Sequence, residues 1–161
     1  MWINFRSLVS YLENMVKGPG LYGYQFIGTP AIRDEKNKWY VPYEQYKNQY
    51  YPNYLSGTAY LIVNRKDKMS FTSKNKLETV IGKLYASTFE VGQIFMEDVY
   101  ITGLAAQKAQ VPRTNAPGFH YSKVEFSVCA YLSLISTHHV SDEEKYIFWS
   151  KLNNKTFSEQ C

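Results

Sequence analysis

The stretch from Tyr51 to Gly103 constrains the fold of this 161-residue chain more than any other part of the sequence. It opens with Tyr51-Pro52-Asn53-Tyr54, which indicates an aromatic turn, and continues into an apolar run over residues 56–63 that predicts a buried strand. Gly57 in this strand would let the backbone approach another group closely. The stretch closes with Glu97-Asp98 in front of an apolar segment, which predicts two adjacent carboxylates at the start of a helix.

The remaining periodicity predicts a mixed α/β chain, because helix-period and strand-like segments alternate loosely along the sequence. Further helices are expected over residues 4–16, around residues 77–84, and from the Ser141 capping box to Leu152. Further strands are expected over residues 21–28 and 129–135, an extended segment over 39–42, and a charged turn over 64–70. No repeat or convincing boundary divides the sequence, so we expect a single domain over residues 1–161.

Composition narrows the function. Aromatic residues make up 17% of the chain, with 15 Tyr, and such rings suit sugars, nucleobases and protein interfaces. The net charge of +4 would suit a nucleotide phosphate. No block of five like charges is present, so a nucleic-acid partner is not expected. The two cysteines, Cys129 and Cys161, match no metal spacing or disulfide framework and are interpreted as a buried strand thiol and a terminal thiol. No transmembrane anchor or signal peptide is recognised.

The Glu97-Asp98 pair has two interpretations. Acidic residues at a helix N-terminus cap free N–H groups and complement the helix dipole. Alternatively, one carboxylate is a general base, because a loop-to-helix junction holds such a group rigidly near an acceptor hydroxyl. The residues alone are compatible with both interpretations.

His138-His139 and the aromatic segment from Trp39 to Tyr54 also have two interpretations each. The histidines follow an apolar segment and precede a helix, which suits metal ligands or a base, or else a solvated loop. The aromatic rings either pack in a core or form a rim that stacks on sugar faces. No phosphate-binding loop, dinucleotide glycine fingerprint, nucleophile elbow or zinc signature is present.

Four segments in order resemble motifs of the β-1,3-galactosyltransferase family (glycosyltransferase family 31). Lys38-Trp39-Tyr40-Val41-Pro42 resembles K-W-x-V-P, and residues 51–60 resemble Y-P-x-Y-x-S-G-x-x-Y. Residues 97–103 resemble E-D-V-Y-x-x-G. His138-x-Val140 with Glu144 and Trp149 is similar to the closing H-x-x-x-x-E-x-x-x-x-W. The resemblance runs from about Asn4 to Leu152.

This resemblance implies the C-terminal portion of a GT-A fold, a Rossmann-like mixed sheet. It implies an inverting hexosyltransferase that moves galactose or N-acetylglucosamine from a UDP-sugar to a glycan or glycoprotein hydroxyl in β-1,3 linkage, with Mn²⁺, on the Golgi membrane. By resemblance, Asp98 is the catalytic base with Glu97 beside it, and His138 is a metal ligand. The implied substrate-binding residues are Trp39, Tyr54, Ser56, Gly57 and Tyr60.

The sequence also departs from the family. Residues 3–12 resemble a segment that follows the family's acidic metal motif, yet only Met1 and Trp2 precede it here. Leu55 stands where the family has cysteine. We therefore expect an N-terminally truncated domain that is inactive by itself. The alternative to the enzyme is an inactive remnant that binds a glycan or a partner.

Overall fold

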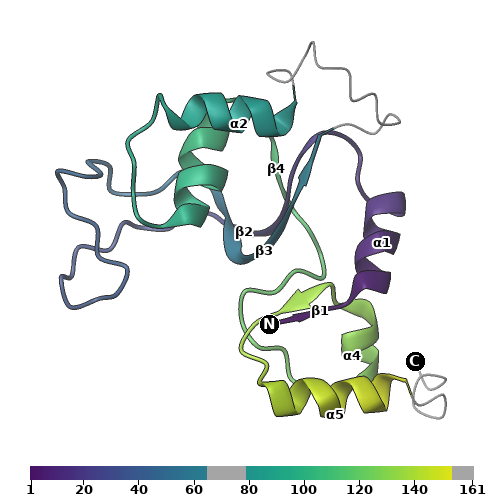
Figure 1. Cartoon of the computed structure of the whole chain (residues 1–161). Helices are drawn as coiled ribbons and strands as arrows, with labels where there is room; N and C mark the ends of the chain where they lie inside the picture. The colour runs from purple at the N-terminus through teal and green to yellow at the C-terminus, as the bar shows by residue number, and fades with distance from the viewer. Residues whose placement is uncertain (65–78, 154–161) are drawn as a thin grey trace. The chain divides into compact units, whose positions relative to one another are not determined.

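The computed structural model describes residues 1–64 and 79–153, which form two compact units (Figure 1). One unit combines Met1–Lys17 with the chain from Ala116 onward, and the other is Gly18–Asn115. Each unit has its own hydrophobic core.

A three-stranded mixed sheet forms the centre of the Gly18–Asn115 unit. Its strands are β2 (Gly20–Phe26), β3 (Tyr54–Val63) and β4 (Arg113–Asn115), in the order β3-β2-β4. β2 pairs antiparallel with β3 and parallel with β4. The two longer strands confirm the strands predicted over residues 21–28 and 56–63, whereas β4 was not predicted.

Helices pack against this sheet. They are α2 (Val80–Thr88), the π-helix η2 (Val99–Ala105) and α3 (Ala106–Lys108), and Figure 1 shows α2 beside the continuous η2–α3 helix. Leu84 of α2, Leu21 of β2 and Ala105 of η2 share one buried cluster. The helices predicted around residues 77–84 and after Glu97-Asp98 are confirmed where described. Leu77 and residues 65–70 of the predicted charged turn lie outside the described residues.

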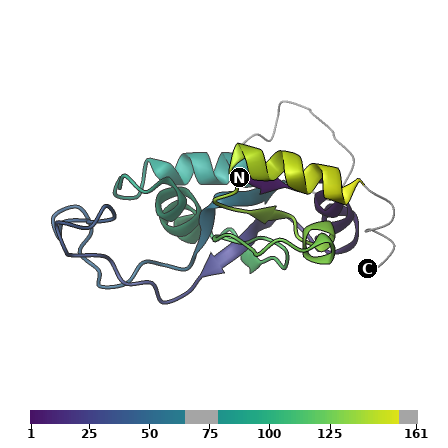
Figure 2. The same cartoon turned by 90° about the horizontal axis from the view of Figure 1, so that it is seen from below.

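A long loop between β2 and β3 carries a second core. Residues 27–53 extend beyond the sheet in both views (Figures 1 and 2). The Arg33 guanidinium holds the loop by donating to the carbonyl oxygens of Val41, Tyr46 and Asn48. Within the loop, Val41 and Tyr46 are buried while Trp39 is exposed, so its aromatic residues divide between core and surface.

The other unit joins both ends of the chain. β1 (Trp2–Ile3) pairs antiparallel with β5 (Ser136–Thr137). Its helices are α1 (Phe5–Asn14), α4 (Val128–Ser133) and α5 (Asp142–Leu152), and Figure 2 shows α5 in yellow beside the strand pair. The predicted helix over residues 4–16 and the predicted Ser141 capping box are confirmed.

The strand predicted over residues 129–135 is wrong, because these residues form most of helix α4. The Ser127 side chain accepts the Ala130 N–H and caps that helix. Cys129 is therefore an exposed helical residue, and it is disulfide-bonded, which overturns its interpretation as a buried strand thiol. Cys161 lies outside the described residues. Among the helices described, none has the length and apolar character that crossing a membrane requires.

Candidate active site

Asp98 lies at the start of η2, where the backbone of two elements fixes its carboxylate. Oδ2 accepts a hydrogen bond from the Gly57 N–H of β3 at 3.1 Å, and Oδ1 accepts one from the Val99 N–H at 2.9 Å. A carboxylate offers about four acceptor positions, so these two bonds leave acceptor capacity on both oxygens. Asp98 is only partly buried. A held carboxylate with free lone pairs is what proton abstraction requires.

Gly57 is the residue that lets β3 lie against this carboxylate. A Cβ at position 57 would lie 3.2 Å from Asp98 Cβ and 3.3 Å from Oδ2. A Cβ at these distances is tight, so Asp98 would have to shift by a few tenths of an ångström to accept it. The close approach predicted at Gly57 is confirmed, and the group approached is the candidate base itself.

Thr102 ties the backbone of Asp98 to β3 from the other side. Its hydroxyl is completely buried and donates to the Asp98 carbonyl oxygen at 2.5 Å. The same Oγ1 accepts the Leu55 N–H at 2.8 Å. The start of η2 is therefore joined to β3 both through the Asp98 carboxylate and through Thr102.

Glu97 is engaged by a tyrosine. The Tyr60 hydroxyl donates to Glu97 Oε1 at 2.5 Å. Burial raises the pKa of Tyr60 well above its usual value, and the hydrogen bond to Glu97 raises it further. Tyr60 thus stays protonated and keeps donating, which orients Glu97 next to Asp98.

Tyr54 and Ser56 lie on β3 beside this pair, with buried side chains. The Tyr54 ring stacks on Phe26 with centroids 5.1 Å apart. Burial raises the pKa of Tyr54, and the nearby Asp98 raises it further. The Ser56 hydroxyl lies 3.0 Å from that of Thr58. Both residues support the strand that carries Gly57, and their direct contact with a substrate stays a prediction.

Trp39 lies in the long loop with 47% of its surface exposed. Its ring is within 10° of parallel to that of Phe95, with centroids 6.5 Å apart. The Lys38 ammonium lies 4.6 Å from the centre of the Trp39 ring.

The Gly18–Asn115 unit contains all the predicted catalytic and substrate-binding residues.

His138 belongs to the other unit, directly after β5. Its Nδ1 is buried and has no hydrogen-bond partner among the described residues. Its ring centroid lies 4.1 Å from that of His139. Burial lowers the pKa of His138, and the neighbouring His139 lowers it further. A neutral imidazole with an unpaired nitrogen suits a single metal–ligand bond.

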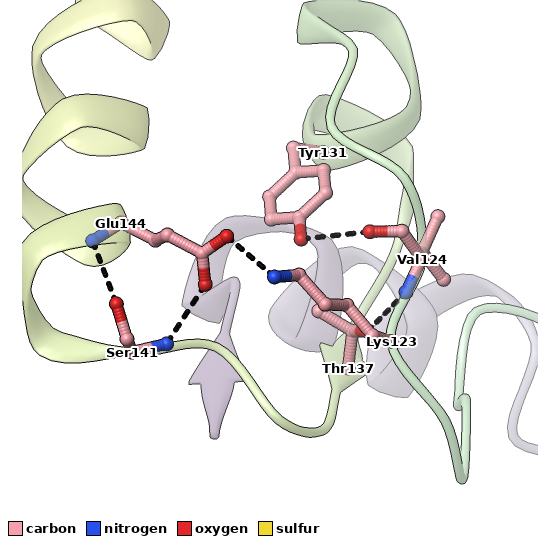
Figure 3. Close-up of polar contacts among 6 residues, drawn as sticks. All are labelled: Lys123, Val124, Tyr131, Thr137, Ser141 and Glu144. Atoms are coloured by element: carbon pink, nitrogen blue, oxygen red, sulfur yellow. Dashed lines mark hydrogen bonds and ion pairs between the residues drawn. The ribbon is translucent and has the colours of Figure 1, made fainter.

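The closing motif has a structural role around His138. Glu144 Oε1 pairs with the Lys123 ammonium, and Oε2 accepts the Ser141 N–H at 3.0 Å (Figure 3). Thr137 Oγ1 accepts the Val124 N–H at 2.9 Å. These contacts tie the segment around residue 123 to both ends of the turn that carries His138.

The comparisons with known proteins show the family of the chain. The model of the galactosyltransferase family matches residues 1–117. The chain belongs to the galactosyltransferase family. The resemblance identified from the sequence motifs is thereby confirmed.

The curated relatives that match the chain are also glycosyltransferases by name. The chain is 31% identical over 133 residues to beta-1,3-galactosyltransferase 1 of Mus musculus and of Homo sapiens, covering 83% of this chain and 36% of each relative. It is 30% identical over 144 residues to the lactosylceramide 1,3-N-acetyl-beta-D-glucosaminyltransferase of Rattus norvegicus, covering 86% of this chain and 34% of that protein. The chain thus spans about a third of the length of the curated relatives it matches.

The family match includes Trp39, the Gly57 strand and Asp98, whereas His138 and Glu144 follow the matched residues. Among residues 1–64 and 79–153, no group of three His, Cys, Asp or Glu side chains is arranged to hold a metal ion. One imidazole nitrogen does not make a manganese site, because manganese prefers several oxygen ligands. The described residues do not by themselves fit the metal, so manganese stays a prediction.

The motifs do not indicate Thr102, which bonds the Asp98 carbonyl oxygen, or Phe95, which stacks on Trp39. Thr102 occupies a variable position of the E-D-V-Y-x-x-G motif, and its role comes from a hydrogen bond to Leu55, 47 residues away in the sequence. Phe95 precedes the motif. It differs from its buried neighbours Ile94 and Met96 in being exposed. No signal in the sequence alone joins either residue to Asp98.

Proposed function

We propose that this chain carries the acceptor-side and general-base part of an inverting β-1,3-hexosyltransferase. The observation that carries the proposal is the Asp98 carboxylate, held by Gly57 and by the start of η2 with free acceptor capacity. The family match and the names of the relatives supply the chemistry to which such a base would contribute.

In this reaction the acceptor hydroxyl gives its proton to Asp98, and its oxygen forms a bond to the anomeric carbon of the donor sugar. The bond between that carbon and the UDP oxygen breaks, and UDP leaves with the electron pair. Attack from the face opposite UDP inverts the anomeric configuration, through an oxocarbenium-like transition state. Glu97, oriented by Tyr60, would add negative charge beside the developing positive charge.

The donor is a UDP-sugar, carrying either galactose or N-acetylglucosamine, because the names of the relatives include both transfers. The acceptor is a glycan or glycoprotein. We further propose that the mixed sheet is a portion of a GT-A fold and that the whole protein works on the Golgi membrane.

A transfer assay tests the proposal. The protein, expressed from its complete open reading frame, is incubated with labelled UDP-galactose or UDP-N-acetylglucosamine and with glycans that end in N-acetylglucosamine or galactose. We expect one donor to be used and a β-1,3 linkage in the product by NMR. If neither donor is used and the protein still binds a glycan, the alternative of an inactive remnant that binds a glycan or a partner would be supported instead.

A further inference from the structure

Trp39 and Phe95 form an exposed pair of aromatic rings, here called the aromatic platform. They are 47% and 54% exposed, and their planes differ by only 10°. The two rings are stacked, with centroids 6.5 Å apart, so a flat ligand lying on the outer face of the stack is parallel to both. Two large rings left half in water forgo burial that would stabilise the fold.

The Phe95 side of the platform is anchored by its neighbours in sequence. Ile94 and Met96 are 4% and 8% exposed and belong to the same core cluster, while Phe95 between them points outward. The Gln93 carbonyl oxygen accepts a hydrogen bond from Gln45 Nε2 at 3.2 Å. This bond joins the segment before Asp98 to the long loop.

The Trp39 side is anchored in a similar way. The Trp39 N–H donates to Asn37 Oδ1 at 2.9 Å. Val41, two residues later, is completely buried in the cluster that also contains Met96. Both rings are thus mounted on one core, so a ligand that binds them meets a preorganised surface and loses little free energy to ordering.

The platform is close to the candidate base. Phe95 precedes Asp98 by three residues, and a chain of that length spans at most about 10 Å between Cα atoms. The exposed Tyr85–Phe89 pair differs in kind. Its rings, at Tyr85 of α2 and at Phe89 just after it, are 88° apart in an edge arrangement and not in a stack.

We propose that the aromatic platform binds the apolar face of a pyranose ring in the acceptor, one sugar removed from the hydroxyl that Asp98 deprotonates. This inference rests on the proposed function and specifies its substrate class, because the enzyme then prefers oligosaccharide acceptors to monosaccharides. Aromatic faces suit the C–H face of a sugar, and the Lys38 ammonium above Trp39 offers three hydrogen-bond donors to its hydroxyls.

Binding measurements test the platform without requiring catalysis. The dissociation constants of two ligand pairs are measured by NMR titration in the presence of UDP. The pairs are methyl β-N-acetylglucosaminide with the methyl glycoside of N-acetylglucosaminyl-β-1,3-galactose, and methyl β-galactoside with methyl β-lactoside. Phe95→Ala is compared with Phe89→Ala, a matched change at a ring that is 74% exposed. Phe95→Tyr keeps the ring.

We expect Phe95→Ala to weaken disaccharide binding about tenfold, which corresponds to about 1.4 kcal/mol, and to leave monosaccharide binding unchanged. Phe89→Ala should change neither, and Phe95→Tyr should restore the disaccharide preference. Equal effects of Phe95→Ala on both ligand lengths, or equal effects of Phe95→Ala and Phe89→Ala, would overturn the proposal. So would a dimer that dissociates in Phe95→Ala during sedimentation, since the platform would then bind a second copy.

The transfer assay separates this inference from the proposed function. A protein that transfers no sugar, yet loses disaccharide binding in Phe95→Ala, would refute the catalytic proposal and support the platform as a glycan site. A protein that transfers sugar with the same KM for disaccharide acceptors in wild type and Phe95→Ala would refute the platform and leave the catalytic proposal standing.

Discussion

At the scale of single residues, the contact between Gly57 and Asp98 connects sequence to chemistry most directly. Glycine at position 57 leaves room for the carboxylate, because a Cβ there would meet Asp98 Cβ at a tight 3.2 Å. The backbone N–H that this approach provides then fixes the carboxylate at 3.1 Å. One missing side chain thereby determines the position of the candidate base.

We expect Gly57→Ala to displace the Asp98 carboxylate and to lower transfer activity about 10-fold to 100-fold, because small misplacements of a catalytic group are costly. The free energy of unfolding should fall by about 1–3 kcal/mol through overpacking. Gly18→Ala is the control, since a Cβ at Gly18 meets nothing within 4 Å. Equal urea-unfolding midpoints and equal activities for the two variants would show that the Gly57 contact is unimportant.

At the scale of elements, η2 is held to β3 by the buried Thr102 hydroxyl. Thr102→Val keeps the shape of the side chain but leaves the Leu55 N–H without its acceptor. We expect a loss of about 1–3 kcal/mol in the free energy of unfolding, the cost of an unsatisfied buried donor. Thr88→Val is the control, because the Thr88 hydroxyl bonds only the Tyr85 carbonyl of its own helix among the described residues. Chemical denaturation measures both variants, and similar losses would contradict the role assigned to Thr102.

Helix α5 is started by the Ser141 capping box, with Glu144 also paired to Lys123 (Figure 3). We expect Ser141→Ala to lower the free energy of unfolding by about 0.5–2 kcal/mol, through loss of the cap. The exposed Ser150 lies in the last turn of the same helix, away from the cap, and alanine is the better helix former there. Ser150→Ala should therefore be neutral or slightly stabilising in thermal unfolding. A Ser141→Ala variant as stable as Ser150→Ala would mean that the capping box contributes nothing.

The sequence predicted the elements whose ends carry local signals. The helices capped by Asn4 and Ser141 were predicted close to their observed bounds. The strand predicted over residues 129–135 is wrong because a short apolar run suits a strand and a helix equally, and the Ser127 cap decides for the helix. The two-residue strands β1 and β5 depend on pairing with each other across the chain. No local pattern encodes that pairing.

The sequence predicted only part of the candidate site, because motifs indicate which residues belong together but not how they bond. Motifs placed Asp98, Gly57 and Tyr60 near one another, and the structure adds their hydrogen bonds. The motifs did not indicate that Tyr60 bonds Glu97 rather than Asp98, or that Tyr54 is buried. Such details depend on the register of β3 against η2, which tertiary packing decides.

At the scale of the whole molecule, buried tyrosines make stability depend on alkaline pH. Burial raises the pKa of Tyr51 to about 12, and burial likewise raises the pKa of Tyr54, Tyr60 and Tyr131. Between the unfolded value of 10.0 and these folded values, the unfolded chain releases protons that the folded chain keeps. The free energy of unfolding is therefore undiminished by these groups below pH 10 and falls as pH rises above it.

Tyr51→Phe tests this account, because the Tyr51 hydroxyl is buried without a hydrogen-bond partner among the described residues. We expect the variant to be as stable as wild type or slightly more stable at pH 7, and to lose less stability between pH 10 and 12. Tyr146→Phe, at a ring that is 79% exposed, is the control. Urea unfolding across this pH range makes the comparison, and parallel pH profiles for Tyr51→Phe and wild type would contradict the assignment.

The central claim is that Asp98 is the general base, and the turnover of Asp98→Asn tests it most directly. The amide keeps the size of the side chain but cannot take the proton, and its NH₂ group would face the N–H of either Gly57 or Val99. Asp34→Asn is the matched control, since Asp34 is exposed in the same unit and accepts the Lys36 N–H. We predict that Asp98→Asn lowers kcat about 100-fold or more while remaining folded, and that Asp34→Asn leaves kcat unchanged. An Asp98→Asn protein that transfers sugar at the wild-type rate would contradict the account.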